Sequence, residues 1–126
     1  MGSKYGEMFS RLSLETATVL FIKNNGEIRC MLATRNCSTA DLVWGRLNLV
    51  LAGHDKRCNI HNGNISVIDL EIGEPRSFNV DRVISIEYYD EVKSLEELEK
   101  IIARHKEFKA RYDAMRPRQV DIDDLV

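Results

Sequence analysis

Apolar residues recur along the chain with a helical spacing at both ends and a strand-like spacing between them. Near the N-terminus, the helical spacing brings four apolar side chains to one face: Tyr5, Met8, Phe9 and Leu12. We expect a short helix whose apolar face packs on the structure that follows. From Thr16 the period changes to two, and β-branched and aromatic residues become frequent, which predicts β-strands.

The stretch VLFIKNNGEIRCMLAT, residues 19–34, predicts a β-hairpin. Asn24, Asn25 and Gly26 separate two alternating segments, and these residue types tolerate the positive φ of tight turns. In the second strand, the alternation predicts that Ile28, Cys30 and Leu32 face the interior. It predicts that Glu27, Arg29 and Met31 face solvent.

The rest of the middle region predicts one short helix and more strands. Ser38 or Thr39 is expected to cap a helix through Leu42 and Trp44. Residues 46–53, RLNLVLAG, are compatible with a strand, and residues 53–64 with an exposed polar loop. Alternation returns at residues 65–70, 75–80 and 82–89. About five short strands with tight turns favour a mainly β fold, a small closed barrel, because closure removes exposed edges.

The C-terminal region predicts a second helix. Ser94 and Glu97 form a capping box, and a helical apolar stripe follows and runs as far as Pro117. The stripe comprises Leu98, Ile101, Ile102, His105, Phe108, Tyr112 and Met115. We therefore divide the chain into a barrel domain at 1–92, a helical extension at 93–117 and an acidic tail at 118–126.

Composition limits the protein class without giving a function. The 126 residues are 44% hydrophobic and 30% charged, with a net charge of -2. The near balance of charge argues against a globally basic nucleic-acid binder. No apolar run is long enough to span a membrane, the N-terminus lacks a signal-peptide pattern, and three cysteines are typical of reduced thiols. We expect a cytoplasmic protein.

Two blocks of sequence resemble a known family, the small WYL-related, Sm-like SH3 β-barrel proteins of tailed bacteriophages. The resemblance covers about residues 14–87. The matching residues are Lys23, Gly26, Arg29, Thr34, Asp69, Leu70, Arg76, Ser77, Phe78, Asp81, Arg82 and Ile84. Pro75 stands where the family has an aromatic residue, and the middle loop is long. The resemblance implies an SH3-like or Sm-like barrel of about five strands. By analogy with related barrels, it also implies binding of RNA, DNA or nucleotides.

Chemistry-bearing residues do not assemble into a catalytic motif. The sequence contains no nucleophile elbow, phosphate-cradling loop or paired-carboxylate motif, so we predict no catalytic residues, no enzyme activity and no cofactor. His54, Cys58 and His61 have a spacing that zinc accepts, but a structural site usually needs a fourth ligand. We interpret this segment as a polar surface loop and predict no metal site.

Basic residues near the predicted strand ends and on the C-terminal helix are candidate phosphate contacts. The predicted nucleic-acid-binding residues are Lys23, Arg29, Arg35, Arg46, Lys56, Arg57, Arg76, Arg104 and Lys109. Trp44, Tyr88 or Tyr89 could stack on bases. The alternative is a solvated surface of mixed charge, because acidic residues are interleaved with the basic ones.

The C-terminal helix carries its own charge signal. Residues 104–118 contain six basic and two acidic residues, a net charge of +4. The helix could follow a phosphate backbone, whereas its apolar stripe could dock on the barrel or pair with a second copy. The tail VDIDDLV resembles a short acidic docking segment, with a disordered solubilising tail as the alternative.

The leading hypothesis is a non-enzymatic phage accessory module that binds nucleic acid and regulates host or phage processes during infection. Two alternatives remain: an antagonist of a host or anti-phage defence protein, and a sensor or sponge for a nucleotide. The expected partner is DNA, RNA or a host protein, with no membrane, in the cytoplasm of the bacterial host. A homo-oligomer is compatible with all three hypotheses.

Overall fold

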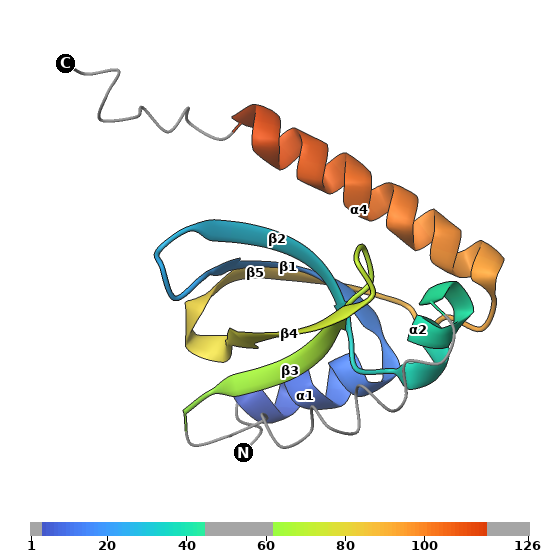
Figure 1. Ribbon diagram of the computed structural model, residues 1–126, viewed down its shortest axis with the longest axis horizontal. Coiled ribbons are helices and arrows are strands. Elements are labelled where there is room, and N and C mark those ends of the chain that lie inside the picture. Colours follow the sequence, from blue (N-terminus) through green and yellow to red (C-terminus); the bar gives the residue numbers. More distant parts are fainter. Residues whose placement is uncertain (1–3, 45–61, 116–126) are drawn as a thin grey trace.

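The computed structural model describes residues 4–44 and 62–115. Five strands form one antiparallel sheet: β1 (Thr16–Ile22), β2 (Ile28–Thr34), β3 (Asn64–Asp69), β4 (Glu74–Asn79) and β5 (Val83–Tyr89). Three α-helices and one short 3₁₀ helix accompany it: α1 (Lys4–Leu14), α2 (Cys37–Trp44), α4 (Leu95–Met115) and η2 (Val80–Arg82). Figure 1 shows α4 across one side of the strands and α1 on the other.

The strand order is β4-β3-β2-β1-β5, and β4 and β5 are the two edges of the sheet. The predicted five strands and terminal helices are confirmed, but the prediction of a mainly β closed barrel is wrong. Of the described residues, 45% are helical and 35% lie in strands, and the barrel is not closed. The sheet curls strongly, as the contact between its first and fourth strands shows: the ring centroids of Phe21 on β1 and Phe78 on β4 lie 5.6 Å apart. It stops short of closure because no ladder joins β4 to β5 among the described strands.

The predicted hairpin is confirmed in its turn and its pairing. Strands β1 and β2 pair over their whole length, from Thr16↔Thr34 to Ile22↔Ile28. In the turn, Gly26 has φ +88°, and its N–H donates to the carbonyl of Lys23 at 2.9 Å. The side chain of Asn25 accepts a hydrogen bond from the Glu27 N–H. Glycine supplies the positive φ without steric cost.

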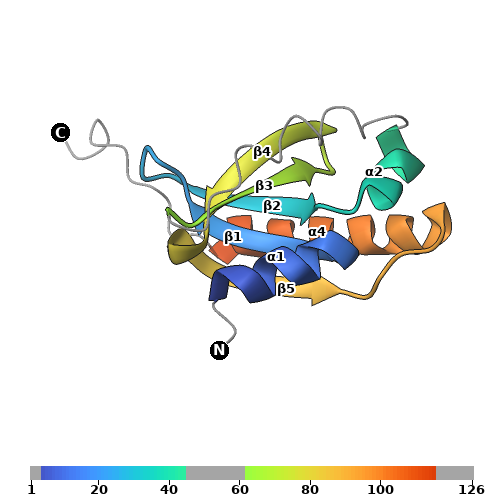
Figure 2. The ribbon, with the colours of Figure 1, turned by 90° about the horizontal axis from the view of Figure 1, so that it is seen from below.

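The predicted facing of the β2 side chains is wrong for Met31, which is fully buried, and for Ile28, which was expected in the interior and is 38% exposed. Both faces of the sheet are covered, as the turned view in Figure 2 shows, so both sets of alternating residues lie in a core. The first core joins the α1 stripe to one face and includes Met8, Leu12, Val19, Met31 and Phe78. The second lies under α2 and α4 and includes Leu32, Ala40, Ile68, Leu70 and Leu98.

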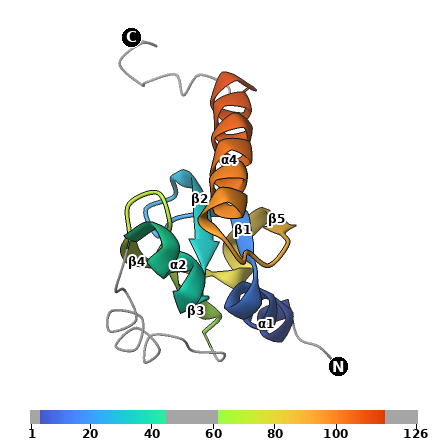
Figure 3. The same ribbon diagram turned by 90° about the vertical axis from the view of Figure 1, so that its right-hand side faces the viewer.

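Helix α4 begins as predicted, and its apolar stripe docks on the sheet, which is one of the two arrangements that the sequence left open. The Ser94 side chain accepts a hydrogen bond from the Glu97 N–H at 3.2 Å, while the Glu97 carboxylate accepts from the Lys93 N–H. Leu98 and His105, on the face of α4 that meets the rest of the molecule, are buried. Figure 3, which looks along the sheet, shows α4 extending past α2 and over the strands. The apolar stripe therefore packs within the molecule.

Helix α2 forms as predicted, but its cap is Asn36 instead of Ser38 or Thr39. The Asn36 side-chain oxygen accepts hydrogen bonds from the N–H groups of Ser38 and Thr39. Asn accepts such bonds as readily as Ser. At the other end, the Trp44 indole N–H donates to the carbonyl of Leu70 at 2.8 Å, which holds α2 against the end of β3.

The pairing of β2 with β3 is much shorter than the other ladders. It consists of Ala33↔Asp69 and Thr34↔Ile68, followed by a hydrogen bond from the Leu70 N–H to the Leu32 carbonyl. The two strands separate beyond this point, so residues 28–31 of β2 pair only with β1 among the described residues. The predicted strand at 46–53 and loop at 53–64 lie almost wholly outside the described residues.

None of the described helices combines the length and the apolar character that crossing a bilayer requires.

Candidate functional site

A cavity of about 340 Å³ opens where the β1–β2 turn faces strands β3 and β4. Its walls come from both hairpins, so the separation of β2 from β3 creates it. The lining residues are Phe21, Ile22, Lys23, Asn24, Asn25, Arg29, Met31, Asn64, Arg76, Ser77, Phe78 and Asn79. Three of them are cationic and none is acidic. The wall therefore carries three positive charges.

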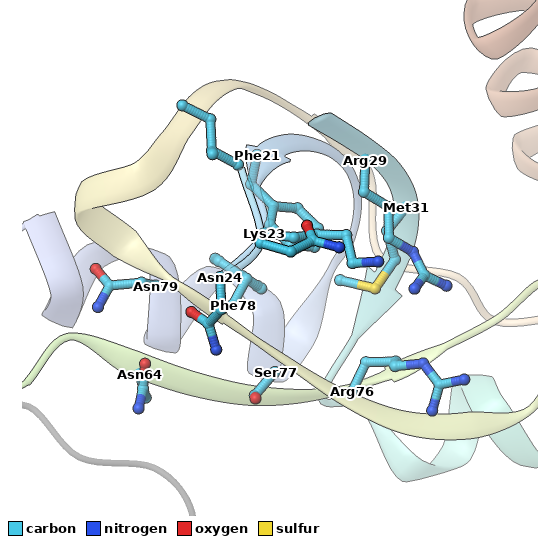
Figure 4. A pocket seen from close by; sticks show the side chains of 12 residues that line it. Phe21, Lys23, Asn24, Arg29, Met31, Asn64, Arg76, Ser77, Phe78 and Asn79 are labelled. Atoms are coloured by element: carbon cyan, nitrogen blue, oxygen red, sulfur yellow. The ribbon is translucent and has the colours of Figure 1, made fainter. Parts of the chain in front are cut away.

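The three cations come from different elements and lie on one side of the cavity, as Figure 4 shows. Lys23 belongs to the turn, Arg29 to β2 and Arg76 to β4. All three were predicted from the sequence as phosphate contacts, and the fold brings them to a common wall.

Each cation has a carboxylate partner outside the cavity wall. Arg76 lies 3.0 Å from Glu74 and Lys23 lies 3.6 Å from Glu27, and both glutamates are about 60% exposed. Exposed pairs of this kind contribute little to stability, about 0–1 kcal/mol. An anionic ligand can therefore replace the glutamates at small cost.

Arg29 has a different partner, because Asp69 is only 3% exposed in its side chain and lies 3.1 Å away. Burial raises the pKa of Asp69, and the Glu71 N–H and the charge of Arg29 offset part of that rise. Losing Arg29 would leave a buried carboxylate without its charged partner. Arg29 thus supports the fold as well as the cavity.

Neutral polar side chains complete the rim, and sequence reasoning missed them as site residues. Asn24, Asn64 and Ser77 line the cavity and make no side-chain hydrogen bond to another described residue. Their donors and acceptors are therefore available to a ligand. Asn25 and Asn79 also line the cavity but use their amide groups in local turns. The only sequence signal for them was the density of Asn at strand ends.

The apolar floor is closed. Phe21 and Phe78 are 4% and 3% exposed, and their rings pack on each other. They give the cavity a rigid base but offer no free aromatic face. The rings predicted to stack on bases lie elsewhere: Arg11 covers Tyr88, Tyr89 is buried, and Trp44 packs at the end of α2.

Three other predicted phosphate contacts lie outside the cavity. Arg35 donates to the Ser66 carbonyl and lies 4.4 Å over the Phe9 ring. Arg104 pairs with Glu87 at 3.3 Å, and Lys109 pairs with Glu71 at 3.4 Å. These side chains join elements of the protein to one another.

The remaining predicted residues fall in the part of the chain that is not described. They are the candidate phosphate contacts Arg46, Lys56 and Arg57 and the candidate zinc ligands His54, Cys58 and His61. Within residues 4–44 and 62–115, no group of three or more His, Cys, Asp or Glu side chains is arranged to hold a metal ion.

A buried polar chain joins α4 to the sheet. The Tyr89 hydroxyl lies 2.6 Å from the Thr18 hydroxyl, which lies 2.8 Å from Nδ1 of His105, while Nε2 of His105 lies 2.8 Å from the Glu71 carboxylate. Burial tends to raise the pKa of Glu71, but hydrogen bonds and charges from His105 and Lys109 lower it overall. Thr18 and His105 are at most 1% exposed, so no substrate reaches them in this arrangement.

The nearby Cys30 is buried, 8% exposed, and burial raises the pKa of its thiol to about 11. A thiol with this pKa is a poor nucleophile at neutral pH. Two other cavities in the described part of the chain have linings that mix acidic and basic residues, whereas the cationic cavity is lined by basic residues without an acidic one.

Searches against protein-family models, curated proteins and solved structures found no match to this chain.

Proposed function

We propose that the protein is a non-enzymatic module that binds single-stranded nucleic acid, with one nucleotide seated in the cationic cavity. The observation that carries this proposal is the wall formed by Lys23, Arg29 and Arg76, which faces available amide and hydroxyl groups across the cavity. Arginine suits phosphate because its planar guanidinium donates two parallel hydrogen bonds. Asn side chains suit base edges because they both donate and accept.

The proposed fold family is the SH3-like or Sm-like fold of phage accessory proteins, here with an open, curled sheet in place of a closed barrel. The strand order β4-β3-β2-β1-β5, the N-terminal helix and the 3₁₀ turn between β4 and β5 support this proposal. The proposed place of action is the cytoplasm of the bacterial host, where the protein would regulate host or phage processes.

The shape of the site favours a single strand over a duplex. The cations line a concave wall, and the cavity holds roughly one nucleotide. In a duplex the bases are stacked and paired, so seating one would require flipping it out at a cost of a few kcal/mol. Because Phe21 and Phe78 are buried, we propose hydrogen bonding to the base edge instead of stacking.

The expected salt dependence is modest. Each phosphate that a protein cation neutralises on a single strand contributes a slope of about -0.7 to the plot of log affinity against log salt. Three cavity cations therefore predict a slope of about -2. A continuous basic surface along α4 would give a steeper one, but Arg104 and Lys109 are engaged with Glu87 and Glu71.

Fluorescence anisotropy tests the proposal, with the full chain titrated into labelled single-stranded DNA, single-stranded RNA and a duplex of the same sequence. Arg76→Ala should weaken single-strand binding about tenfold, because charge-assisted hydrogen bonds contribute about 1.5–3 kcal/mol. Arg111→Ala is the matched control, since Arg111 is 77% exposed on α4 and pairs only loosely with Glu107, at 3.9 Å.

Equal loss of affinity in both variants would indicate non-specific attraction and contradict the cavity as the site. No binding to any strand at low salt would reject nucleic acid as the partner. Competition by free mononucleotides at equal strength would instead support the alternative of a nucleotide sensor or sponge.

A further inference from the structure

Among the described strands, part of β2 has a free edge in the interior of the sheet. Residues 28–31 hydrogen-bond to β1 on one side, while the ladder to β3 begins only at Leu32. Backbone N–H and C=O groups along such an edge are a template for another strand. The β2 residues Ile28, Arg29 and Cys30 line a groove of about 230 Å³ that follows this edge.

The two sides of this edge have different chemistry. Arg29 and Met31 face the cationic cavity together with Lys23 and Arg76. On the other side, the groove places Ile28 opposite Ile72 and Tyr112, with Ile28 38% and Ile72 40% exposed. Because side chains alternate along a strand, a segment added here would meet cations with every second residue and apolar groups with the others. The edge therefore fits an alternating acidic and apolar sequence.

The chain itself contains such a sequence. Residues 120–123 read Val-Asp-Ile-Asp, with aspartates at every second position. The reverse arrangement is less favourable for the aspartates, because the groove is lined by three carboxylates against two cations, whereas the cavity is lined by three cations and no carboxylate. Charge thus sets which face of the segment meets which side of the edge.

The segment begins within reach of the edge. Helix α4 ends at Met115, and Tyr112 and Asp113 in its last turn already line the groove beside Arg29. Four residues, 116–119, separate the helix from Val120. An extended chain of that length spans about 13 Å. Figure 1 shows this end of α4 directed toward the side of the sheet that holds the β1–β2 turn.

We propose that residues 120–123 add as a strand to the free edge of β2, with Asp121 and Asp123 toward the cavity cations and Val120 and Ile122 toward the groove. The segment would then occupy the rim of the cavity and compete with an anionic ligand. The docking itself is independent of what that ligand is.

Amide hydrogen exchange measured by NMR on the full chain tests the docking without any ligand. The amides of residues 28–31 that point away from β1 should exchange slowly, and those that pair with β1 serve as an internal reference. Asp123→Lys should speed exchange at the free-edge amides about tenfold or more, because a lysine among three cations is repelled and the docked strand opens more often.

Asp124→Lys is the matched control, because the charge change is identical and residue 124 lies beyond the segment proposed to dock. It should leave exchange at the same amides within about twofold. Fast exchange at these amides in the unaltered protein would overturn the proposal, as would an equal effect of the two substitutions. Protection that increases with protein concentration would assign the strand to a second copy and also overturn it.

Discussion

At the scale of single residues, long-range partners decide what each charged side chain does. Arg29, Arg104 and Lys109 are all basic residues on regular elements, yet only Arg29 lines the cavity. The other two face carboxylates 17 and 38 residues away in the sequence. Sequence alone identifies such side chains as cations, but their partners come from the fold.

Glu71 makes stability depend on pH in a defined direction. Its pKa is lower in the folded protein than its ordinary value of 4.5. Its contribution is thus fully present above about pH 4.5 and is lost as the pH falls through the lower folded pKa. Glu71→Gln should cost about 1–2 kcal/mol at pH 7, and the difference from the unaltered protein should shrink below about pH 4.5.

Urea unfolding at pH 7, 5 and 3.5 measures this difference. Glu87→Gln is the control, because Glu87 is 47% exposed and its pair with Arg104 should contribute less than about 1 kcal/mol. A pH-independent difference between Glu71→Gln and the unaltered protein would show that the carboxylate charge is not what stabilises this site.

Gly73 is constrained twice, by its backbone and by a neighbouring ring. Its φ is +68°, and an added Cβ would lie 2.5 Å from the Trp44 ring. Gly26 has φ +88° but nothing within 4 Å of the same position. Gly26→Ala should therefore cost about 1–2 kcal/mol from the left-handed backbone alone. Gly73→Ala should cost at least about 1 kcal/mol more, because it also displaces the ring that bonds Leu70. Thermal unfolding of both variants compares the two costs, and equal costs would contradict the tight contact.

At the scale of elements, the sequence predicts what is local and misses what is not. The period-two and helical spacings correctly predict β1, β2, α1 and α4, because each is set by neighbours within a few residues. The facing of Met31 was wrong because the alternation gives two faces without stating that helices cover both. The prediction of a closed barrel was wrong for a similar reason, since the β2–β3 ladder depends on residues more than 30 positions apart.

The docking of α4 on the sheet should contribute strongly to stability. Leu98 is fully buried in the second core, whereas Leu95 on the same helix is 43% exposed. Leu98→Ala should cost about 2–5 kcal/mol, because it removes buried methyl groups and leaves a cavity. Leu95→Ala should cost less than about 1 kcal/mol. Urea unfolding of the two variants tests this contrast, and similar costs would mean that α4 is not firmly packed.

At the scale of the whole molecule, the covered faces of the sheet leave its rim for binding. Helix α1 occupies one face and helices α2 and α4 the other, as the three views show. The cationic cavity and the free edge of β2 meet at Arg29, which lines both the cavity and the groove. The two proposals therefore concern one region of the molecule.

If both proposals hold, the acidic segment and a nucleic-acid strand exclude each other. Asp123→Lys should then raise the affinity for single-stranded nucleic acid more than Asp124→Lys, although both substitutions add the same charge. Several-fold is expected, because a tethered segment competes at an effective concentration near the millimolar range. Anisotropy titrations at matched salt measure the difference. Equal affinities of the two variants would show that the acidic segment does not compete with the nucleic acid.

The buried chain from Tyr89 through Thr18 to His105 has a consequence for the position of α4. Apolar contacts tolerate sliding, whereas hydrogen bonds between enclosed polar atoms exist at one spacing only. Moving α4 along its axis by one turn, about 5.4 Å, would carry the imidazole away from both of its partners and leave the enclosed Thr18 hydroxyl with Tyr89 as its one remaining partner. The His105 imidazole therefore fixes the position of α4 along its axis, whereas the apolar stripe of the helix alone would be compatible with several positions.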